Sequence, residues 1–242
     1  MTIAREPEMK IGILQPGYLP WLGFFEQMCR TDIFVIYDDV QYDKNGWRNR
    51  NKIKTPQGEQ WLTVPVLYKY EEKPRVDRVR IDPKSDWRKK HCLSIRYNYA
   101  RAPYFKGYFP IFEEAYAKDW EFLIDLDMFF IRRLAAALGI DDSKIVRSSS
   151  LDLTGDRLER LVKICKHFKA DVFYEGASGK EYIEDACFSS EGVTVEYQDY
   201  RHPVYAQLHG VFVPYLSVID LLFNHGQESL SIILNEQIKE TA

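Results

Sequence analysis

Residues Gln15–Phe24 (QPGYLPWLGF) form the first segment whose residue types suit ligand binding. Two prolines stiffen this loop, and the rings of Tyr18 and Trp21 could stack on a planar or sugar-like group. A helix is expected to follow, and its N-terminus would offer free backbone N–H groups to an anion near Gln15. The alternative is a structural turn whose aromatic side chains pack on the core. The segment alone does not separate the two.

The second segment, Lys44–Lys52, is a dense array of hydrogen-bond donors. It contains the candidate ligand-binding residues Lys44, Arg48, Asn49, Arg50 and Asn51. Arginine forks match phosphate and carboxylate oxygens in a bidentate way. The alternative is a solvated charged loop, the usual meaning of a basic run.

The third segment, Tyr174–Tyr182 (YEGASGKEY), contains the candidate binding residues Ser178, Gly179 and Lys180. Glycines let backbone N–H groups approach an anion, and a lysine neutralises its charge. The spacing differs from that of a Walker A loop. A flexible strand-to-helix turn is the competing interpretation.

Histidine supplies the candidate catalytic groups, because its pKa lies near neutral pH. His202 precedes a proline that favours an extended backbone, and His91 is the second candidate. The alternative interpretation of both is a histidine that hydrogen-bonds to neighbouring backbone. A zinc site from His202, His209 and His225 lacks a helical pair at i, i+4, so the sequence predicts no metal and indicates no particular cofactor.

Composition limits the classes of function. The 242 residues contain 33 Lys+Arg and 36 Asp+Glu, a net charge of −3 that argues against general nucleic-acid binding. The sequence shows no apolar export signal and no run of about 18 apolar residues, so we expect no membrane span. Four widely spaced cysteines are then expected to be reduced thiols in the cytoplasm. The oligomeric state is not indicated.

Short apolar runs bounded by turn residues predict the strands that position these segments. They alternate with segments of helical periodicity, which predicts an α/β fold: layered, Rossmann-like, with a mainly parallel sheet and helices on both faces. The predicted strands are Lys10–Leu14, Ile33–Tyr37, Ile145–Arg147, Asp171–Tyr174 and Val193–Tyr197. An inserted β-hairpin is expected from Gln60–Leu67 and Val76–Ile81.

The predicted helices are Trp21–Cys29, Trp87–Asn98, Tyr108–Ala117, Trp120–Leu138, Thr154–Phe168 with Thr154 as N-cap, and Pro214–Asn224. No linker or repeat divides the chain. We therefore expect one domain at residues 10–228, an extension at 1–9 and a tail at 229–242. Three of the segments follow predicted strands, which predicts that Gln15–Trp21, Arg48–Asn51 and Gly176–Lys180 line one cleft at the carboxyl edge of the sheet.

Taken in order, these motifs resemble the WbqC-like protein family. The shared features are Q-P-x-Y-x-P-W (Gln15–Trp21), W-x-N-R-N (Trp47–Asn51), Y-x-x-G-x-S-G-K-x-Y, His202-Pro203-x-Tyr205-x-Gln207 and the segment Ser217–Gly226. The match runs from about Ile11 to Gly226. A fainter similarity is to HIGH-type nucleotidyltransferases: Trp21–Phe24 falls at the place of their H-x-G-H motif, keeping the glycine and losing both histidines.

The resemblance implies a setting in O-antigen, lipopolysaccharide or related biosynthesis and a transferase-type reaction. The expected substrate is an anionic, nucleotide-linked or acyl-activated sugar or amino-sugar intermediate. Arginine and lysine would hold its phosphate or carboxylate, and His202 or His91 would serve as base. The alternative is a scaffold protein that binds a glycan precursor or nucleotide without chemistry.

Overall fold

The computed structural model describes residues 8–44 and 46–235, which divide by their contacts into two compact units. The sheet unit comprises residues 8–15, 26–39 and 143–200, and the helical unit comprises residues 16–25, 40–142 and 201–235 with the gap at 45. Residues 1–7 of the predicted extension and 236–242 of the predicted tail lie outside the described residues. The single-domain boundaries stay a prediction.

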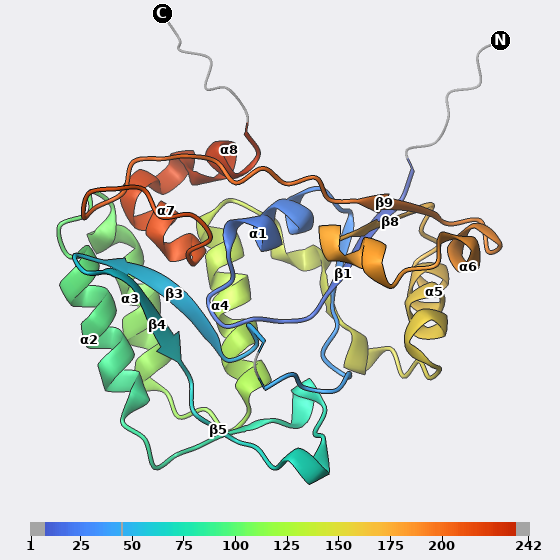
Figure 1. Cartoon of the computed structure of the whole chain (residues 1–242), viewed down its shortest axis with the longest axis horizontal. Helices are drawn as coiled ribbons and strands as arrows, with labels where there is room; N and C mark the ends of the chain where they lie inside the picture. Colours follow the sequence, from blue (N-terminus) through green and yellow to red (C-terminus); the bar gives the residue numbers. More distant parts are fainter. Residues whose placement is uncertain (1–7, 45, 236–242) are drawn as a thin grey trace, which may run out of the picture. The chain divides into compact units, whose positions relative to one another are not determined.

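The sheet unit contains a five-stranded parallel sheet, so the predicted α/β class is confirmed. Its strands lie in the order β7-β2-β1-β8-β9. In chain order they are β1 (Lys10–Leu14), β2 (Ile33–Ile36), β7 (Ile145–Arg147), β8 (Val172–Glu175) and β9 (Thr194–Tyr197). Figure 1 shows β1, β8 and β9 side by side.

The residue types explain why the central strands pair closely. Ile11, Gly12 and Ile13 of β1 are buried. A Cβ at Gly12 would come within 3.0 Å of the Phe34 ring on β2, so the glycine leaves room for that side chain. Burying the apolar strands on both faces contributes roughly 25 cal/mol for each Å² of apolar surface removed from water.

The helices of the sheet unit are the second half of α1 (Leu22–Cys29), α5 (Arg157–His167) and α6 (Asp185–Ser189). The chain moves from β1 to β2 in one direction and from β7 to β8 in the other. Because parallel crossovers are right-handed, α1 and α5 cover opposite faces of the sheet. The predicted N-cap Thr154 is wrong: Asp156 accepts from the Glu159 N–H at 2.9 Å, forming a capping box that begins α5 later.

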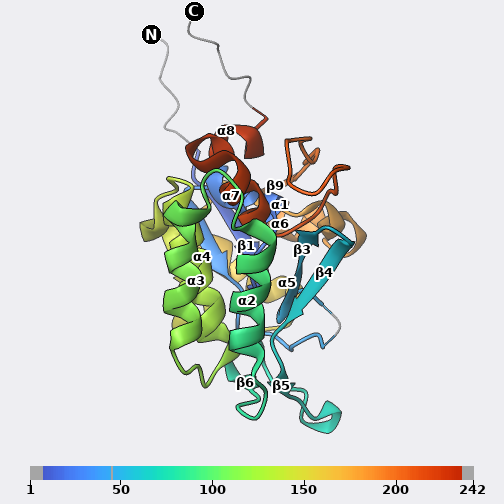
Figure 2. The ribbon, with the colours of Figure 1, turned by 90° about the vertical axis from the view of Figure 1, so that its left-hand side faces the viewer.

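The helical unit packs α2 (Trp87–Tyr99), α3 (Phe105–Ala117) and α4 (Leu123–Ala137) side by side (Figure 2). Helices α7 (Val218–His225) and α8 (Ser229–Ile233) follow near the C-terminal end of the described chain. Helix α3 begins three residues earlier than predicted, with Pro110 inside it. Stacking of Phe105 on Phe109, with ring centroids 4.5 Å apart, holds that first turn in the core.

The antiparallel pairing predicted between Gln60–Leu67 and Val76–Ile81 is present as the short pair β5 (Val66–Leu67) and β6 (Arg80–Ile81). A further hairpin, which the sequence did not predict, pairs β3 (Arg50–Thr55) with β4 (Gly58–Thr63) around a turn where Gly58 has a φ of +109°. Arg50–Lys52 therefore lie on a strand rather than in a loop. Alternation places Asn51 and Ile53 in the buried layer and Arg50 and Lys52 toward the other side.

Candidate functional site

The order of the parallel strands marks a switch point between β1 and β8. From β1 the chain continues to β2 on one side, and from β8 it continues to β9 on the other. Open α/β sheets bind ligands outside the carboxyl ends of their strands at such a point. Here these ends carry Gln15, after β1, and Glu175, the last residue of β8.

Glu175 is a buried carboxyl group at this edge, and only 4% of the residue is exposed. Its Oε1 accepts a hydrogen bond from the Tyr182 hydroxyl at 3.0 Å. Burial raises the pKa of Glu175 to about 7, although Tyr182, the Gly176 backbone N–H and Arg157 each oppose that rise. Near neutral pH the carboxyl group can therefore accept or donate a proton.

The segment after β8 wraps around Glu175. Gly179 is buried, and a Cβ at this position would overlap the Cγ atom of Glu175. The Gly179 N–H donates to the Gly176 carbonyl at 2.8 Å, which closes a short helical turn over residues 177–181. The glycine of the predicted S-G-K segment is thus explained by the close approach of a carboxylate side chain.

Two cationic side chains lie against aromatic rings, one in the segment after β8 and the other on β9. The Arg157 guanidinium stands 3.7 Å from the ring centroid of Tyr182, and the Lys180 ammonium 5.5 Å from that of Tyr197. Arg157 and Lys180 are exposed, as is Ser178. The region around Glu175 thus combines a titratable carboxyl group with two accessible cations, a set that suits proton transfer beside an anion.

Asp38, just beyond β2, makes a different kind of cluster. It is fully buried, and its carboxylate accepts from Arg147 Nε at 2.6 Å and from the Ser149 backbone N–H at 2.9 Å. The Ser148 and Ser149 hydroxyls donate to it as well. These bonds tie the ends of β2 and β7 together and leave the carboxylate well satisfied, so this cluster is structural.

In the helical unit, the structure brings two predicted segments into contact. The Tyr18 N–H donates to the Arg48 carbonyl at 3.0 Å, and Arg48 Nη1 donates to the Pro16 carbonyl at 2.7 Å. Asn51 Nδ2 reaches the Leu19 carbonyl at 2.6 Å, while Asn49 Nδ2 bonds the Val64 carbonyl at 2.8 Å. Both asparagines are buried; Asn51 ties the loop to the hairpin, and Asn49 links the two ends of the hairpin.

Arg48 belongs to a buried polar cluster that sequence reasoning missed. Asp127 on α4 is fully buried, and neither of its carboxyl oxygens has a hydrogen-bond partner among the described residues. Burial raises the pKa of Asp127 well above its usual range, while the Arg48 charge opposes the rise. Desolvation in turn lowers the pKa of Arg48, and Asp127 and Asp43 oppose that change.

Tyr18 and His91 form a buried hydrogen-bonded group with Tyr116. The Tyr18 hydroxyl lies 2.8 Å from His91 Nδ1 and 2.5 Å from the Tyr116 hydroxyl. A hydrogen bond also joins His91 to the Thr63 backbone, and burial lowers the pKa of His91 to about 4. The ring of Tyr18 is fully buried, so it is closed to a stacking ligand in this conformation.

Trp47 and Trp61 form an exposed aromatic surface in this unit. They are 47% and 42% exposed, and their ring centroids lie 5.2 Å apart. The Arg50 guanidinium stands 4.6 Å and the Lys52 ammonium 5.2 Å from the Trp61 ring centroid. Lys44 is exposed, 5.5 Å from the ring of Tyr68. This surface offers aromatic faces beside cations, an arrangement that suits a base with an attached phosphate.

His202 lies in an irregular segment and is held by backbone groups on both ring nitrogens. Its Nδ1 is 2.8 Å from the Pro203 carbonyl, and its Nε2 accepts from the Tyr215 N–H at 3.1 Å. Burial lowers the pKa of His202. Trp21 is linked to this segment, because its ring centroid lies 6.0 Å from that of Tyr215. With Nδ1–H donating to a carbonyl, neither nitrogen has a lone pair available to a substrate.

The predicted residues therefore fall into two sets. Tyr18, Trp21, Lys44, Arg48, Asn49, Arg50, Asn51, His91 and His202 belong to the helical unit, and Gln15, Ser178, Gly179 and Lys180 belong to the sheet unit. The shared cleft and the catalytic histidines stay predictions. Glu175, Arg157, Asp127 and Trp61 were missed. Glu175 had a sequence signal, since it directly follows an apolar strand next to a glycine-rich turn.

Two observations concern whole classes of site. Within residues 8–44 and 46–235, no three His, Cys, Asp or Glu side chains gather as a potential metal site. In the same part of the chain, every helix is too short or too polar to cross a bilayer.

Comparison with known proteins decides the family. Residues 15–232 match the WbqC-like protein family. The chain belongs to the WbqC-like family. It is also 35% identical over 222 residues to the uncharacterized protein Rv1507c of Mycobacterium tuberculosis, covering 91% of this chain and 95% of that relative. No solved structure matches the chain significantly.

Proposed function

We propose that this WbqC-like protein is a transferase that acts on an anionic, nucleotide-linked or acyl-activated sugar or amino-sugar intermediate in surface-polysaccharide or related biosynthesis. The observation that carries the proposal is the buried Glu175 carboxyl group at the β1/β8 switch point, with a pKa raised to about 7. Such a carboxyl group is suited to general-base catalysis at neutral pH.

In the proposed reaction, the Glu175 carboxylate takes the proton from an acceptor hydroxyl or amine. The acceptor oxygen or nitrogen then forms a bond to the electrophilic carbon of the donor, and the bond from that carbon to the leaving group breaks. The leaving group departs as a phosphate or thiolate anion. Arg157 and Lys180, both exposed beside this segment, would bind the anionic part of the donor.

The exposed Trp47–Trp61 pair, with Arg50 beside it, supports a nucleotide-linked donor. Stacking on such rings contributes about 1–3 kcal/mol for each base, and a nearby cation favours the attached phosphates. This surface lies in the helical unit, and nucleotide binding to it is proposed for that unit by itself. A purely binding role is favoured by a different observation: His91 and His202, the candidate bases suggested by the sequence, are both engaged with backbone groups.

The test combines a binding screen with a transfer assay. Nucleotide sugars, acyl-coenzyme A thioesters and aminoacyl donors are first screened by thermal shift, since a bound ligand raises the melting temperature by mass action. Donors that bind are incubated with amino-sugar acceptors, and products are identified by mass spectrometry. The wild-type protein should form product, and Glu175→Gln should lower turnover about a hundredfold or more with donor binding retained.

The matched control is Glu181→Gln. Glu181 is an exposed carboxyl group in the segment that follows β8, so this variant should behave as wild type. Two outcomes contradict the proposal. Donor binding without any product in the wild-type protein would support the scaffold alternative. Full turnover in Glu175→Gln together with a loss of turnover in His202→Asn would assign the general base to His202 instead of Glu175.

A further inference from the structure

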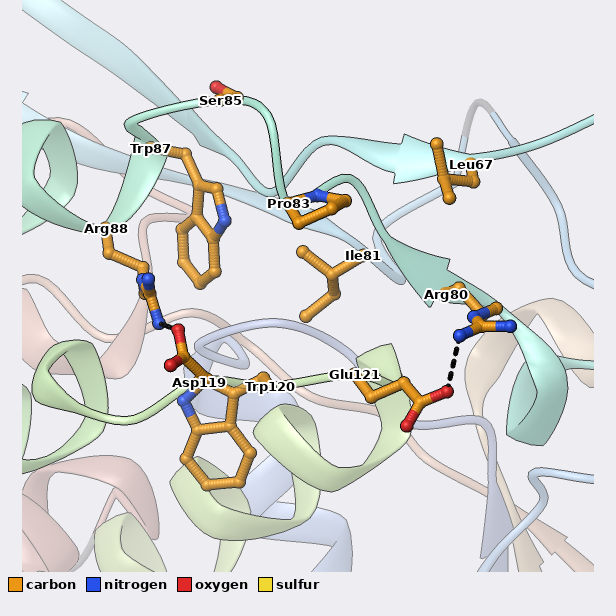
Figure 3. Close-up of a pocket in the computed structure, with 10 residues that line it drawn as sticks. All are labelled: Leu67, Arg80, Ile81, Pro83, Ser85, Trp87, Arg88, Asp119, Trp120 and Glu121. Atoms are coloured by element: carbon orange, nitrogen blue, oxygen red, sulfur yellow. Dashed lines mark hydrogen bonds and ion pairs between the residues drawn. The ribbon is translucent and has the colours of Figure 1, made fainter.

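The helical unit contains a cavity of about 450 Å³ that none of the predicted segments uses. Its walls come from β5, β6, the turn before α2, the first turn of α2 and the connection between α3 and α4 (Figure 3). The lining residues are Leu67, Arg80, Ile81, Pro83, Ser85, Trp87, Arg88, Asp119, Trp120 and Glu121. A cavity of this size falls in the range of small-molecule sites.

The apolar part of the lining is held firmly. Ile81 and Trp87 are each 5% exposed, so most of each side chain packs into the core. Trp120 Nε1 donates to the Ala115 carbonyl at 2.7 Å, which fixes the orientation of its indole ring. The Trp87 ring stands edge-on to Tyr116, with centroids 5.9 Å apart. These buried side chains hold the cavity in shape, and exposed apolar surface is supplied by Leu67 and Pro83.

Two ion pairs lie at opposite ends of the cavity, with Ile81 and Pro83 between them (Figure 3). Arg80 Nη2 contacts Glu121 Oε1 at 2.6 Å, and Arg88 contacts Asp119. The Asp119 side chain is 94% exposed, so this pair contributes little to stability. A guanidinium has five N–H donors and a carboxylate about four lone-pair sites, so each pair can bind further groups.

This arrangement selects among ligand chemistries. Each end presents one positive and one negative group, so a phosphate or ammonium meets repulsion together with attraction. A hydroxyl group has no such conflict, because it accepts from the guanidinium and donates to the carboxylate. The walls between the pairs require an apolar face. A pyranose ring has both features, with C–H groups on its faces and hydroxyls around its edge.

We propose that this cavity binds a neutral pyranose unit of a saccharide, with its C–H face on the exposed apolar side chains of Pro83 and Leu67 and its hydroxyls on the Arg80–Glu121 and Arg88–Asp119 pairs. The proposal is independent of Glu175, because it concerns binding and requires no proton transfer. It assigns saccharide recognition to a site in the helical unit.

The experiment titrates the full chain with methyl α-D-glucopyranoside, galactopyranoside and mannopyranoside and follows the indole N–H signals by NMR. At least one glycoside should shift the Trp87 and Trp120 signals with a millimolar Kd, the affinity expected of a single small ring. Tetrahydropyran tests the apolar face without hydroxyls, and inorganic phosphate tests anion binding. Two results would overturn the proposal. One is that tetrahydropyran binds as tightly as the best glycoside, and the other is that phosphate competes with the glycoside and reverses its shifts of the indole signals.

Variants locate the site. Glu121→Gln changes one exposed acceptor and should weaken glycoside binding about tenfold, as expected for a hydrogen bond to a charged group. Leu67→Ala removes an exposed apolar side chain of the lining and should also weaken glycoside binding. Glu113→Gln is the matched control, because Glu113 makes an exposed pair with Arg96 at 2.8 Å and does not line this cavity. Unchanged affinity in both cavity variants, or no glycoside binding to the wild-type protein, would contradict the assignment.

Discussion

The raised pKa of Glu175 makes the stability of the protein depend on pH in a defined direction. Its value of about 7 in the folded chain compares with an ordinary value of 4.5. Between these values the folded state binds a proton that the unfolded state has released, so stability falls as pH rises. The contribution is fully present below pH about 4.5 and lost above about 7. At 1.36 kcal/mol per pKa unit, the loss is about 3 kcal/mol.

The substitution Glu175→Gln isolates this contribution, because the amide keeps an acceptor for Tyr182 and does not titrate. Urea unfolding of both proteins from pH about 4.5 to 8.5 gives the difference in unfolding free energy. As the pH rises across that range, the unfolding free energy of the variant should increase by about 3 kcal/mol relative to that of wild type. Glu181→Gln, an exposed carboxyl group in the same segment, should follow wild type throughout. A constant difference between wild type and Glu175→Gln would refute the burial argument.

Three further predictions concern the predicted site residues. Arg48→Ala should cost about 1–3 kcal/mol of unfolding free energy by urea titration, because it leaves buried groups unpaired; Arg50→Ala should change stability by less than about 1 kcal/mol and instead weaken donor binding by calorimetry. Gly179→Ala should destabilise by about 1–3 kcal/mol through overpacking, whereas Gly176→Ala, with no atom within 4 Å of the added Cβ, should leave the melting temperature nearly unchanged. His202→Asn should keep turnover within a few-fold of wild type, and a hundredfold loss would restore it as the base.

The parallel sheet could be predicted from the sequence because its strands are short apolar runs with turn residues at both ends. The β3–β4 hairpin was not predicted, since Arg50–Thr55 is rich in polar residues and resembles a loop. Its buried positions, Asn51 and Lys54, have their polar atoms satisfied by other parts of the chain: Lys54 Nζ donates to the Val211 carbonyl at 2.6 Å. Local periodicity cannot show such partners, because they are distant in sequence.

Of the predicted arrangement of segments, the structure shows the contact between the Pro16–Trp21 loop and Arg48–Asn51, and the shared cleft stays a prediction. The pKa of Glu175 depends on how completely the fold buries it, and residue type alone does not reveal burial. Tyr18 illustrates the converse, since its aromatic ring suggested stacking while its hydroxyl serves a buried network with His91.

The pH dependence of the transfer reaction tests the central claim most directly. With the donor and acceptor identified by the screen, kcat/KM is measured from pH about 5.5 to 9 for wild type and Glu175→Gln. A general base at Glu175 predicts a rate that rises with pH through an apparent pKa near 7, and the loss of this rise in the variant. A wild-type profile that is flat across this range, or a rise that persists in Glu175→Gln, would contradict the assignment of Glu175 as the base.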